Sequence, residues 1–242
     1  MAKYKVLSTK KLEPSLVQQA EENDIEIIEQ EFISIKPIWN QQTFDKIISL
    51  TDRGVSAIAF TSANAVDSLN SYMHAGDIYH GIRWNIFCLS GKTKEAVSNA
   101  LLLIKNIAGE AEDAAGLANK IIKQEVKEII FFCSNKRRDE LPDALKGANV
   151  KVHEIILYET IETPIVIKED FDAVLFFSPS GVQSFFASNE LDPDSICFAI
   201  GRTTATSIAT FTNNTIIKSP VPDPKMLVEQ VIEHFKQKPA VN

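Results

Sequence analysis

The sequence FTSANAV at residues 60–66 recurs in altered form as FFSPSGV at residues 176–182. A second pair follows in the same order, with LSGKT at residues 89–93 and AIGRT at residues 199–203. In each copy an apolar run ends in a short turn of small polar residues. The two pairs begin 116 and 110 residues apart, and this nearly constant spacing indicates an internal repeat.

Short apolar runs alternate with helix-like stretches along the whole chain, beginning with a segment opened by Pro14, a residue favoured in the first turn of a helix. This alternation predicts an α/β fold with parallel, doubly wound sheets. The runs that we expect to be strands are residues 5–8, 25–28, 57–60, 86–89, 104–108, 128–133, 150–153, 173–177, 196–200 and 215–218.

The repeat divides these strands between two similar domains. The last three expected strands of the chain match the first three strands within residues 39–154. The first two strands of the chain match the last two strands within that range. We therefore expect a discontinuous outer domain, an inserted domain, and two extended linkers that lie side by side and act as a hinge around a ligand cleft. The expected boundaries are residues 1–31 plus 165–242 for the outer domain, 39–154 for the inserted domain, and 32–38 and 155–164 for the linkers.

Composition narrows the class of protein. The 242 residues are 45% hydrophobic and carry a formal net charge of −7, which argues against binding to a nucleic-acid backbone. No apolar stretch approaches the roughly 18 residues of a membrane span, and the first residues lack the apolar segment of a signal peptide. We expect a cytoplasmic protein whose cysteines, Cys88, Cys133 and Cys197, are buried thiols rather than disulfides or metal ligands.

The repeated turns are the first candidates for a binding site. In parallel sheets, ligands bind beyond the carboxyl ends of the strands, and the turns at residues 61–64, 91–93, 178–181 and 201–204 follow strands and precede helices. Their backbone N–H groups and hydroxyls suit a carboxylate-rich ligand, although such residues also serve purely as helix caps. The spacing of a phosphate-binding P-loop is missing.

Two further features remain open at this stage. The basic turn that contains Lys136, Arg137 and Arg138 either faces a ligand or pairs with Asp139 and Glu140 at a solvated helix start. Tyr158, on the expected return linker, either holds its phenol over the cleft or is simply a half-buried linker residue.

Taken in order, the chain resembles the uroporphyrinogen-III synthase family over nearly its full length. The resemblance rests on the turn after Phe60, the RRDEL segment at residues 137–141, the stretch of residues 150–160 ending in Tyr-x-Thr at Tyr158, the FSPSG turn at residues 177–181, and the IGxTTA stretch at residues 200–205. It implies two flavodoxin-like domains joined by a two-stranded linker.

The resemblance also implies a reaction without a cofactor or a metal. Hydroxymethylbilane, an open tetrapyrrole with eight carboxylates, loses its terminal hydroxyl to give an azafulvene. That group attacks the substituted carbon of the last pyrrole, and the spiro intermediate fragments and recombines to uroporphyrinogen III with this ring inverted. The protein has to assist departure of the hydroxyl and hold the chain for the inverted closure.

The site residues follow from the resemblance. Tyr158 matches a tyrosine that assists loss of the hydroxyl, since a phenol can donate its proton at neutral pH. The expected substrate-binding residues are Thr61, Ser62, Ser90, Ser134, Arg137, Ser178, Ser180, Gly201, Thr203 and Thr204. The expected partners are the substrate and, transiently, the preceding deaminase, and the protein is expected to be a monomer that binds neither nucleic acid nor membranes.

Another class of protein fits the same pattern. A two-domain α/β protein that closes on an anionic metabolite without converting it would share the fold and the anion sites. A phenol over the cleft favours the enzyme, because a pure binding protein has no need of it. A flavin or response-regulator domain fits less well, because the first strand is followed by neither a phosphoacceptor cluster nor a flavin phosphate loop.

Overall fold

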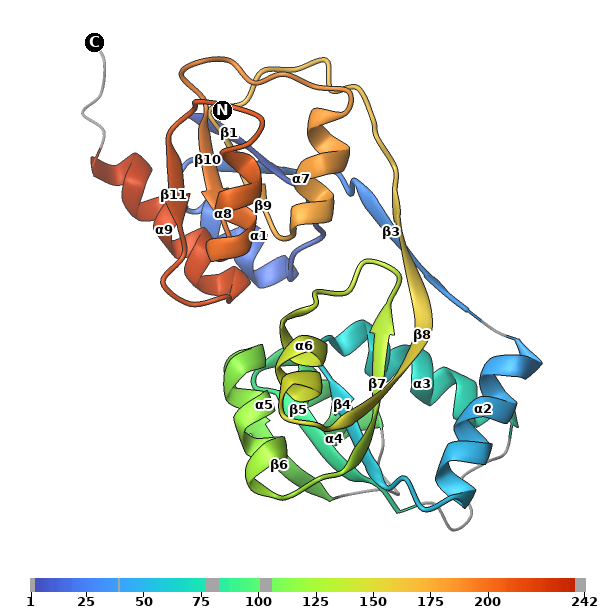
Figure 1. The fold of residues 1–242 in the computed structure, drawn as a ribbon. Coiled ribbons are helices and arrows are strands. Elements are labelled where there is room, and N and C mark those ends of the chain that lie inside the picture. The colour runs from blue at the N-terminus through green and yellow to red at the C-terminus, as the bar shows by residue number, and fades with distance from the viewer. Residues whose placement is uncertain (1–2, 39, 77–82, 101–105, 238–242) are drawn as a thin grey trace. The chain divides into compact units, whose positions relative to one another are not determined.

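The computed structural model describes residues 3–38, 40–76, 83–100 and 106–237. The chain forms two compact units. We call residues 35–160 the inserted unit, and residues 1–34 together with 161–242 the discontinuous unit. Each has its own sheet and its own hydrophobic core (Figure 1).

The inserted unit contains a six-stranded sheet in the order β3-β8-β7-β4-β5-β6. From β4 onward, the strands numbered along the chain lie in the order 3-2-1-4-5, which matches the first five strands of the Rossmann order 3-2-1-4-5-6. Its strands are β3 (Ile33–Pro37), β4 (Ala57–Phe60), β5 (Asn85–Leu89), β6 (Ile107–Ala111), β7 (Glu128–Ser134) and β8 (Lys151–Glu162).

The discontinuous unit has five parallel strands in the order β11-β10-β9-β1-β2. Numbered along the chain, this is 2-1-3-4-5, the flavodoxin-like order that the resemblance implied. Position by position, β9, β10 and β11 correspond to β4, β5 and β6, and β1 and β2 correspond to β7 and β8. The α/β fold with two parallel sheets is therefore confirmed. The strands are β1 (Tyr4–Ser8), β2 (Ile25–Glu29), β9 (Ala173–Phe176), β10 (Ile196–Ala199) and β11 (Ile216–Lys218).

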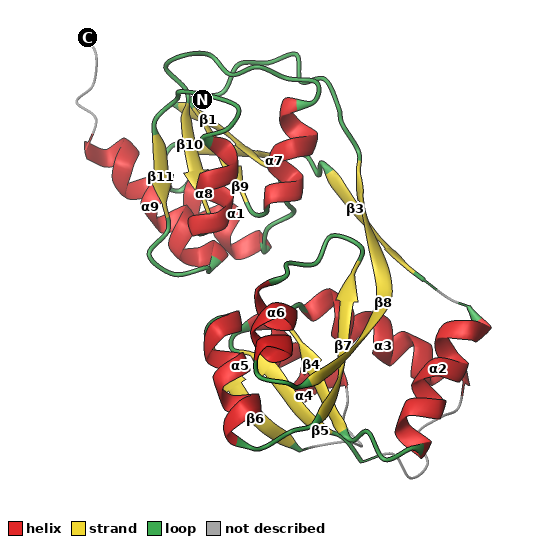
Figure 2. Ribbon diagram, viewed as in Figure 1, coloured by secondary structure: helices red, strands yellow, loops and turns green. Residues whose placement is uncertain are grey.

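Helices cover both faces of each sheet (Figure 2). In the inserted unit α2, α3 and α4 pack on one face and α5 and α6 on the other; in the discontinuous unit α1 and α9 oppose α7 and α8. The bounds are α1 (Pro14–Glu21), α2 (Gln41–Asp52), α3 (Ala63–Gly76), α4 (Lys92–Ala100), α5 (Ala114–Lys123), α6 (Glu140–Gly147), α7 (Pro179–Phe186), α8 (Arg202–Ile208) and α9 (Pro224–Gln237).

Two strand boundaries differ from those expected from sequence. The strand predicted at residues 104–108 begins partly outside the described residues, and β6 runs over Ile107–Ala111. It is an edge strand with only half-buried or exposed side chains, so its apolar signal is weak. The strand predicted to stop at His153 continues as β8 to Glu162.

The extension of β8 carries Tyr158 into the sheet of the inserted unit. Ser134 at the end of β7 pairs with Tyr158, whereas the preceding pair joins Cys133 to Ile156. One residue of β8, Leu157, is therefore inserted as a β-bulge. On the side of β8 that faces β3, the backbone carbonyl of Leu157 accepts a hydrogen bond from Ile38 N at 2.8 Å.

The three cysteines are free and buried, as predicted. Burial raises the pKa of the Cys88 and Cys133 thiols to about 11 and that of Cys197 to about 12. No helix in the described part of the chain is long and apolar enough to cross a membrane.

Candidate active site

The strand order of the inserted unit brings two polar turns to adjacent strands. β4 and β7 are neighbours at the point where the order of the sheet reverses, which is where open α/β sheets bind ligands. Thr61 and Ser62 follow β4, and Ser134 ends β7. The carboxyl ends of these strands therefore form the candidate site.

Tyr158 lies at this edge of the sheet. Its phenol oxygen donates a hydrogen bond to Ser62 Oγ over 3.0 Å, and the side chain is only 5% exposed. The two residues are 96 positions apart in sequence, so this contact depends on the whole β4-to-β8 arrangement. The structure brings together two residues that the sequence assigned to one site.

Ser62 is held from a second side. Asn64 N donates to Ser62 Oγ at 3.2 Å, in the turn that leads into α3. Since Ser62 Oγ accepts from both Tyr158 and Asn64, its own hydrogen is directed elsewhere and can be donated to an anionic oxygen. The pair can thus present a hydroxyl donor next to a phenol whose orientation is fixed.

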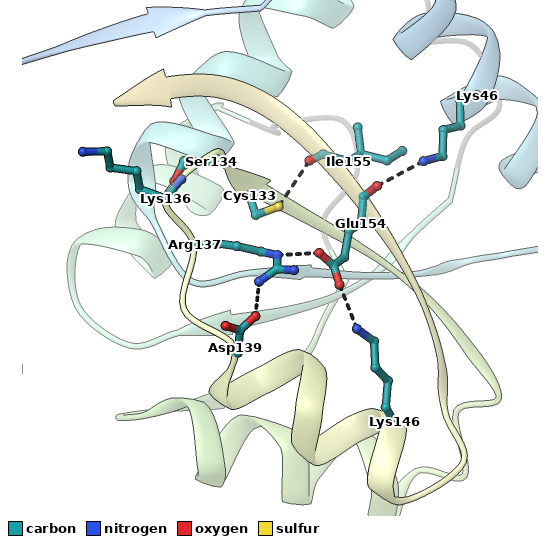
Figure 3. Close-up of polar contacts among 9 residues, drawn as sticks. All are labelled: Lys46, Cys133, Ser134, Lys136, Arg137, Asp139, Lys146, Glu154 and Ile155. Carbon is teal, nitrogen blue, oxygen red and sulfur yellow. Dashed lines mark hydrogen bonds and ion pairs between the residues drawn. The ribbon is translucent and has the colours of Figure 1, made fainter. Parts of the chain in front are cut away.

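The turn after β7 is braced by charged residues (Figure 3). Arg137 Nε donates to Glu154 and its Nη1 donates to Asp139. Glu154 also accepts from Lys146 Nζ at 3.1 Å, and its backbone carbonyl accepts from Lys46 Nζ at 3.1 Å. The guanidinium of Arg137 therefore crosslinks this turn to β8 and to the start of α6.

The sequence left open whether the basic turn faces a ligand or pairs with acidic residues at a solvated helix start, and these contacts bear on that choice. Burial disfavours the charge on Arg137, but its bonds to Asp139 and Glu154 outweigh burial and raise its pKa. The pairing with Asp139 is the one that the solvated-helix reading expected, whereas the pairing with Glu154 was not foreseen. The side chain of Lys136 is directed away from this ion-pair cluster, and Lys136 N donates to Ser134 Oγ at 3.2 Å.

The remaining predicted site residue of the inserted unit, Ser90, follows the neighbouring strand β5. Its backbone N–H donates to Ala111 O at 2.8 Å, so it is part of the ladder between β5 and β6. Ser90 thus lies at the same edge of the sheet as Ser62, but one strand farther from β7.

In the discontinuous unit, the predicted residues lie at the carboxyl ends of β9 and β10. Ser178 caps α7, its Oγ accepting from Gly181 N at 3.0 Å, and Ser180 lies in the first turn of that helix. Gly201 is the N-cap of α8, and Thr203 and Thr204 lie in its first turn, with Thr204 only 2% exposed.

The two repeated glycines do not share a backbone conformation. Gly91 has φ +68°, in the left-handed region that favours glycine. Gly201 has φ −176°, an extended conformation open to any residue. Residues that align in the two copies therefore reach their helices by different turns, and only Gly91 needs to be glycine for conformational reasons.

Sequence reasoning missed two residues that shape the site. Asn135 Oδ1 accepts from Thr160 N at 2.9 Å, and Glu154 anchors Arg137. A lone carboxylate on a strand gave no signal for Glu154. For Asn135, the only signal was its place directly after Ser134 in the turn. Within the described ranges, no group of three or more His, Cys, Asp or Glu residues could hold a metal ion.

The fold and these turns define a class of protein: an α/β protein built from two copies of a doubly wound unit, with polar turns at the helix starts. In one copy, a buried phenol lies where the strand order of the sheet reverses. Within that class, the family model described as uroporphyrinogen-III synthase HemD matches residues 14–229. The chain belongs to that family.

Solved structures agree on the fold. A mutant uroporphyrinogen III synthase from the extremely thermophilic bacterium Thermus thermophilus superposes with a TM-score of 0.66 at 16% identity, over 98% of this chain and 100% of that one. The uroporphyrinogen-III synthetase of Helicobacter pylori gives 0.67 at 15% identity, over 96% and 99%. A search of curated protein sequences returns no match.

Proposed function

We propose that this protein is a uroporphyrinogen-III synthase, which converts hydroxymethylbilane to uroporphyrinogen III with inversion of the terminal ring. The single observation that carries the proposal is the hydrogen bond between Tyr158 and Ser62 at the switch point of the inserted unit. Membership of the HemD family supports it.

Tyr158 acts on the leaving hydroxyl in this proposal. The bond between the terminal methylene carbon and its oxygen breaks, the electron pair leaves with the oxygen, and the phenol proton converts the departing hydroxide to water. The pyrrole nitrogen supplies the electron pair, which gives an azafulvenium cation beside the tyrosinate. Transfer of its N–H proton back to the tyrosinate leaves the neutral azafulvene.

In the resting protein the phenol donates its proton to Ser62 Oγ. When the substrate binds, this hydrogen bond reverses, so that the Ser62 hydroxyl donates to the phenol oxygen and the phenol proton is free for the leaving hydroxyl. The phenol ring itself keeps its orientation.

The substrate carboxylates are proposed to meet the helix-start turns. Backbone N–H groups at helix N-termini attract anions, which suits a ligand with eight carboxylates even though the protein carries a net charge of −7. The residues proposed to bind substrate are Thr61, Ser62, Ser90, Ser134, Arg137, Ser178, Ser180, Gly201, Thr203 and Thr204. Arg137 acts there mainly through the turn that it braces, since its guanidinium already holds two carboxylates.

The cellular setting is part of the same proposal. Hydroxymethylbilane closes spontaneously to the uninverted isomer, so the enzyme has to receive it promptly from the deaminase that makes it. We propose a cytoplasmic monomer that contacts that deaminase transiently.

The test is the isomer composition of the product. Hydroxymethylbilane generated from porphobilinogen by the deaminase is supplied to the purified protein, and the oxidised uroporphyrins are separated by chromatography. We expect isomer III in place of isomer I. Isomer I alone, from protein with the far-UV spectrum of an α/β fold, would refute the activity and favour a protein that binds an anionic metabolite.

Thr204 provides a second test. We expect Thr204→Ala to lower the rate of isomer III formation by weakening substrate positioning. Wild-type kinetics for this variant would make Thr204 a plain first-turn residue of α8 with no part in the reaction.

A further inference from the structure

The bulge in β8 determines which face of the sheet Tyr158 occupies. Ile155 and Leu157, two residues apart, pack into the same core cluster as Phe60 of β4, as the alternation of a strand requires. Tyr158 belongs to that cluster as well, although it directly follows Leu157. In a regular register Leu157 would pair with Ser134, and Tyr158 would point to the opposite face, away from Ser62.

Such a distortion has to be held in place. Bulges are rare in parallel sheets, and they are over-represented next to active sites, where they redirect a side chain. β7 ends at Ser134, whereas β8 continues to Glu162, so the backbone groups of this extension need partners other than β7. On the opposite side of β8, toward β3, Ile38 N donates to the carbonyl of Leu157.

Asn135 makes two hydrogen bonds to this end of β8. Its backbone N–H donates to Tyr158 O at 3.3 Å, which is the regular ladder bond of the Ser134–Tyr158 pair. Its side-chain Oδ1 accepts from Thr160 N at 2.9 Å, beyond the end of β7. These two hydrogen bonds fix the backbone of β8 at the residues before and after Glu159. One residue thus fixes the backbone that carries the phenol, from the turn that begins directly after Ser134.

We propose that Asn135 is a positioning residue for Tyr158: its side chain holds the bulged end of β8 so that the phenol stays against Ser62. This inference rests on the proposed function, because positioning is useful only if the phenol acts on substrate. Asn135 acts through the strand that it holds and need not touch the substrate.

A double-mutant cycle tests the coupling. Asn135→Ala is expected to lower kcat for isomer III formation about tenfold, with KM within about twofold. In a Tyr158→Phe background, the same substitution is expected to lower kcat less than about twofold, because there is no longer a phenol hydroxyl to position. An equal loss in both backgrounds would overturn the proposal.

A conservative variant gives an independent check. Asn135→Asp keeps an oxygen that accepts from Thr160 N, so we expect kcat to return to within about twofold of wild type. KM is expected to rise, since a new carboxylate near the site repels an anionic substrate. Asn135→Asp with kcat as low as that of Asn135→Ala would contradict the role of this acceptor.

Asn189 offers a matched control in the discontinuous unit. Its Oδ1 likewise accepts a backbone N–H, from Ile167 at 2.7 Å. Asn189→Ala is expected to reduce stability without the background-dependent change in kcat. If this variant reproduced the tenfold loss and its dependence on Tyr158, a general loss of rigidity would explain both results and the proposal would fail.

A measurement on the resting protein tests the clamp, by which we mean the hydrogen bond from Thr160 N to Asn135 Oδ1, separately from the reaction. Hydrogen exchange of the Thr160 amide requires no substrate, and we expect at least about tenfold faster exchange in Asn135→Ala but not in Asn135→Asp. Unchanged exchange in Asn135→Ala would overturn the clamp even if the wild type makes isomer III. Faster exchange in Asn135→Ala, alongside a wild-type protein that makes only isomer I, would leave the clamp standing and refute the proposed function alone.

Discussion

Corresponding strands occupy the same places in the two sheets, but the register of β7–β8 differs from that of its counterpart, β1–β2, at the candidate site. In the discontinuous unit, β1 and β2 pair in unbroken register from Tyr4 with Ile25 to Ser8 with Glu29. In the inserted unit, the corresponding strands β7 and β8 slip by one residue just before Ser134 pairs with Tyr158. The difference is a single inserted residue at the end of an otherwise shared ladder.

Equivalent positions therefore carry different chemistry. Glu29, opposite Ser8, uses its carboxylate to accept a hydrogen bond from Leu12 N at 2.5 Å and so fixes the turn before α1. Tyr158, opposite Ser134, is turned into the core face and bonds Ser62. A duplicated scaffold thus gained its candidate catalytic group through a local change of register, with the strand order of the sheet unchanged.

The largest effect that we expect concerns the separate cores. Phe132 stacks on Phe60 in the inserted unit, and Phe176 packs edge-on against Phe185 in the discontinuous unit; Phe132 and Phe176 are fully buried. Phe132→Ala and Phe176→Ala should each cost about 3–5 kcal/mol of unfolding free energy. Hydrogen-exchange mass spectrometry during urea unfolding should place each loss in the unit that carries the substitution, and equal losses in both units would contradict separate cores.

The next effect separates the two equivalent positions in the ladders. Tyr158→Phe should slow isomer III formation about a hundredfold while substrate binding is retained, because the proton donor is lost but the ring remains. Glu29→Gln, its counterpart in the discontinuous unit, keeps an acceptor for Leu12 N and should leave kcat within about twofold. Steady-state kinetics on both variants make the comparison, and a Tyr158→Phe enzyme at the wild-type rate would remove the phenol from the mechanism.

A smaller effect distinguishes the two glycine turns. Gly91→Ala forces a side chain into the left-handed region and should cost about 1–2 kcal/mol. Gly201→Ser places a good N-cap residue at an extended position with no atom within 4 Å of its Cβ, and should stabilise by a few tenths of a kcal/mol. Urea denaturation measures both, and a matching loss at the two sites would mean that the turns are alike after all.

The effect that is smallest at neutral pH, where it vanishes, appears only in alkaline solution. Burial raises the pKa of Cys88 and Cys133 from 9.0 to about 11, and that of Cys197 from 9.0 to about 12. The unfolded chain therefore loses these protons first, so stability is unaffected below about pH 9 and falls as the pH rises toward 11 and 12. At about pH 8, below the unfolded pKa, the thiols should react with Ellman's reagent only on unfolding, and rapid labelling of the native protein would contradict their burial.

Much of the fold was predictable because both sheets are parallel and buried. Strands such as β4 and β9 consist wholly of buried apolar residues and end in polar turns, which is a strong local signal. The edge strand β6 contains Gly109 and Glu110 and has no fully buried side chain, so its position was predicted too early. The length of β8 was missed because its second half resembles an extended linker in sequence.

The candidate site was predictable only in part. Ser62 and Tyr158 could be assigned through the resemblance, but their contact depends on a shift of register, and sequence encodes a register only weakly where no single face decides it. The adjacent buried residues Leu157 and Tyr158 break the expected alternation, which is the one local trace of the bulge. The clamp by Asn135 had no such trace, because a hydrogen bond to the backbone of Thr160 places no demand on the identity of that residue.

The interleaved strand order also constrains how the chain folds as it leaves the ribosome. β1 lies between β2 and β9, and Val6 pairs with Ala173, so the first strand lacks one neighbour until more than half of the protein has been synthesised. The inserted unit is continuous in sequence, and its last strand, β8, ends at Glu162, before β9 begins. Because domains fold as their chains are completed, the unit with the phenol is expected to form first. Until β9 emerges, the opening strand-helix-strand unit exposes one unpaired edge of β1, a surface that invites aggregation and that a chaperone would recognise.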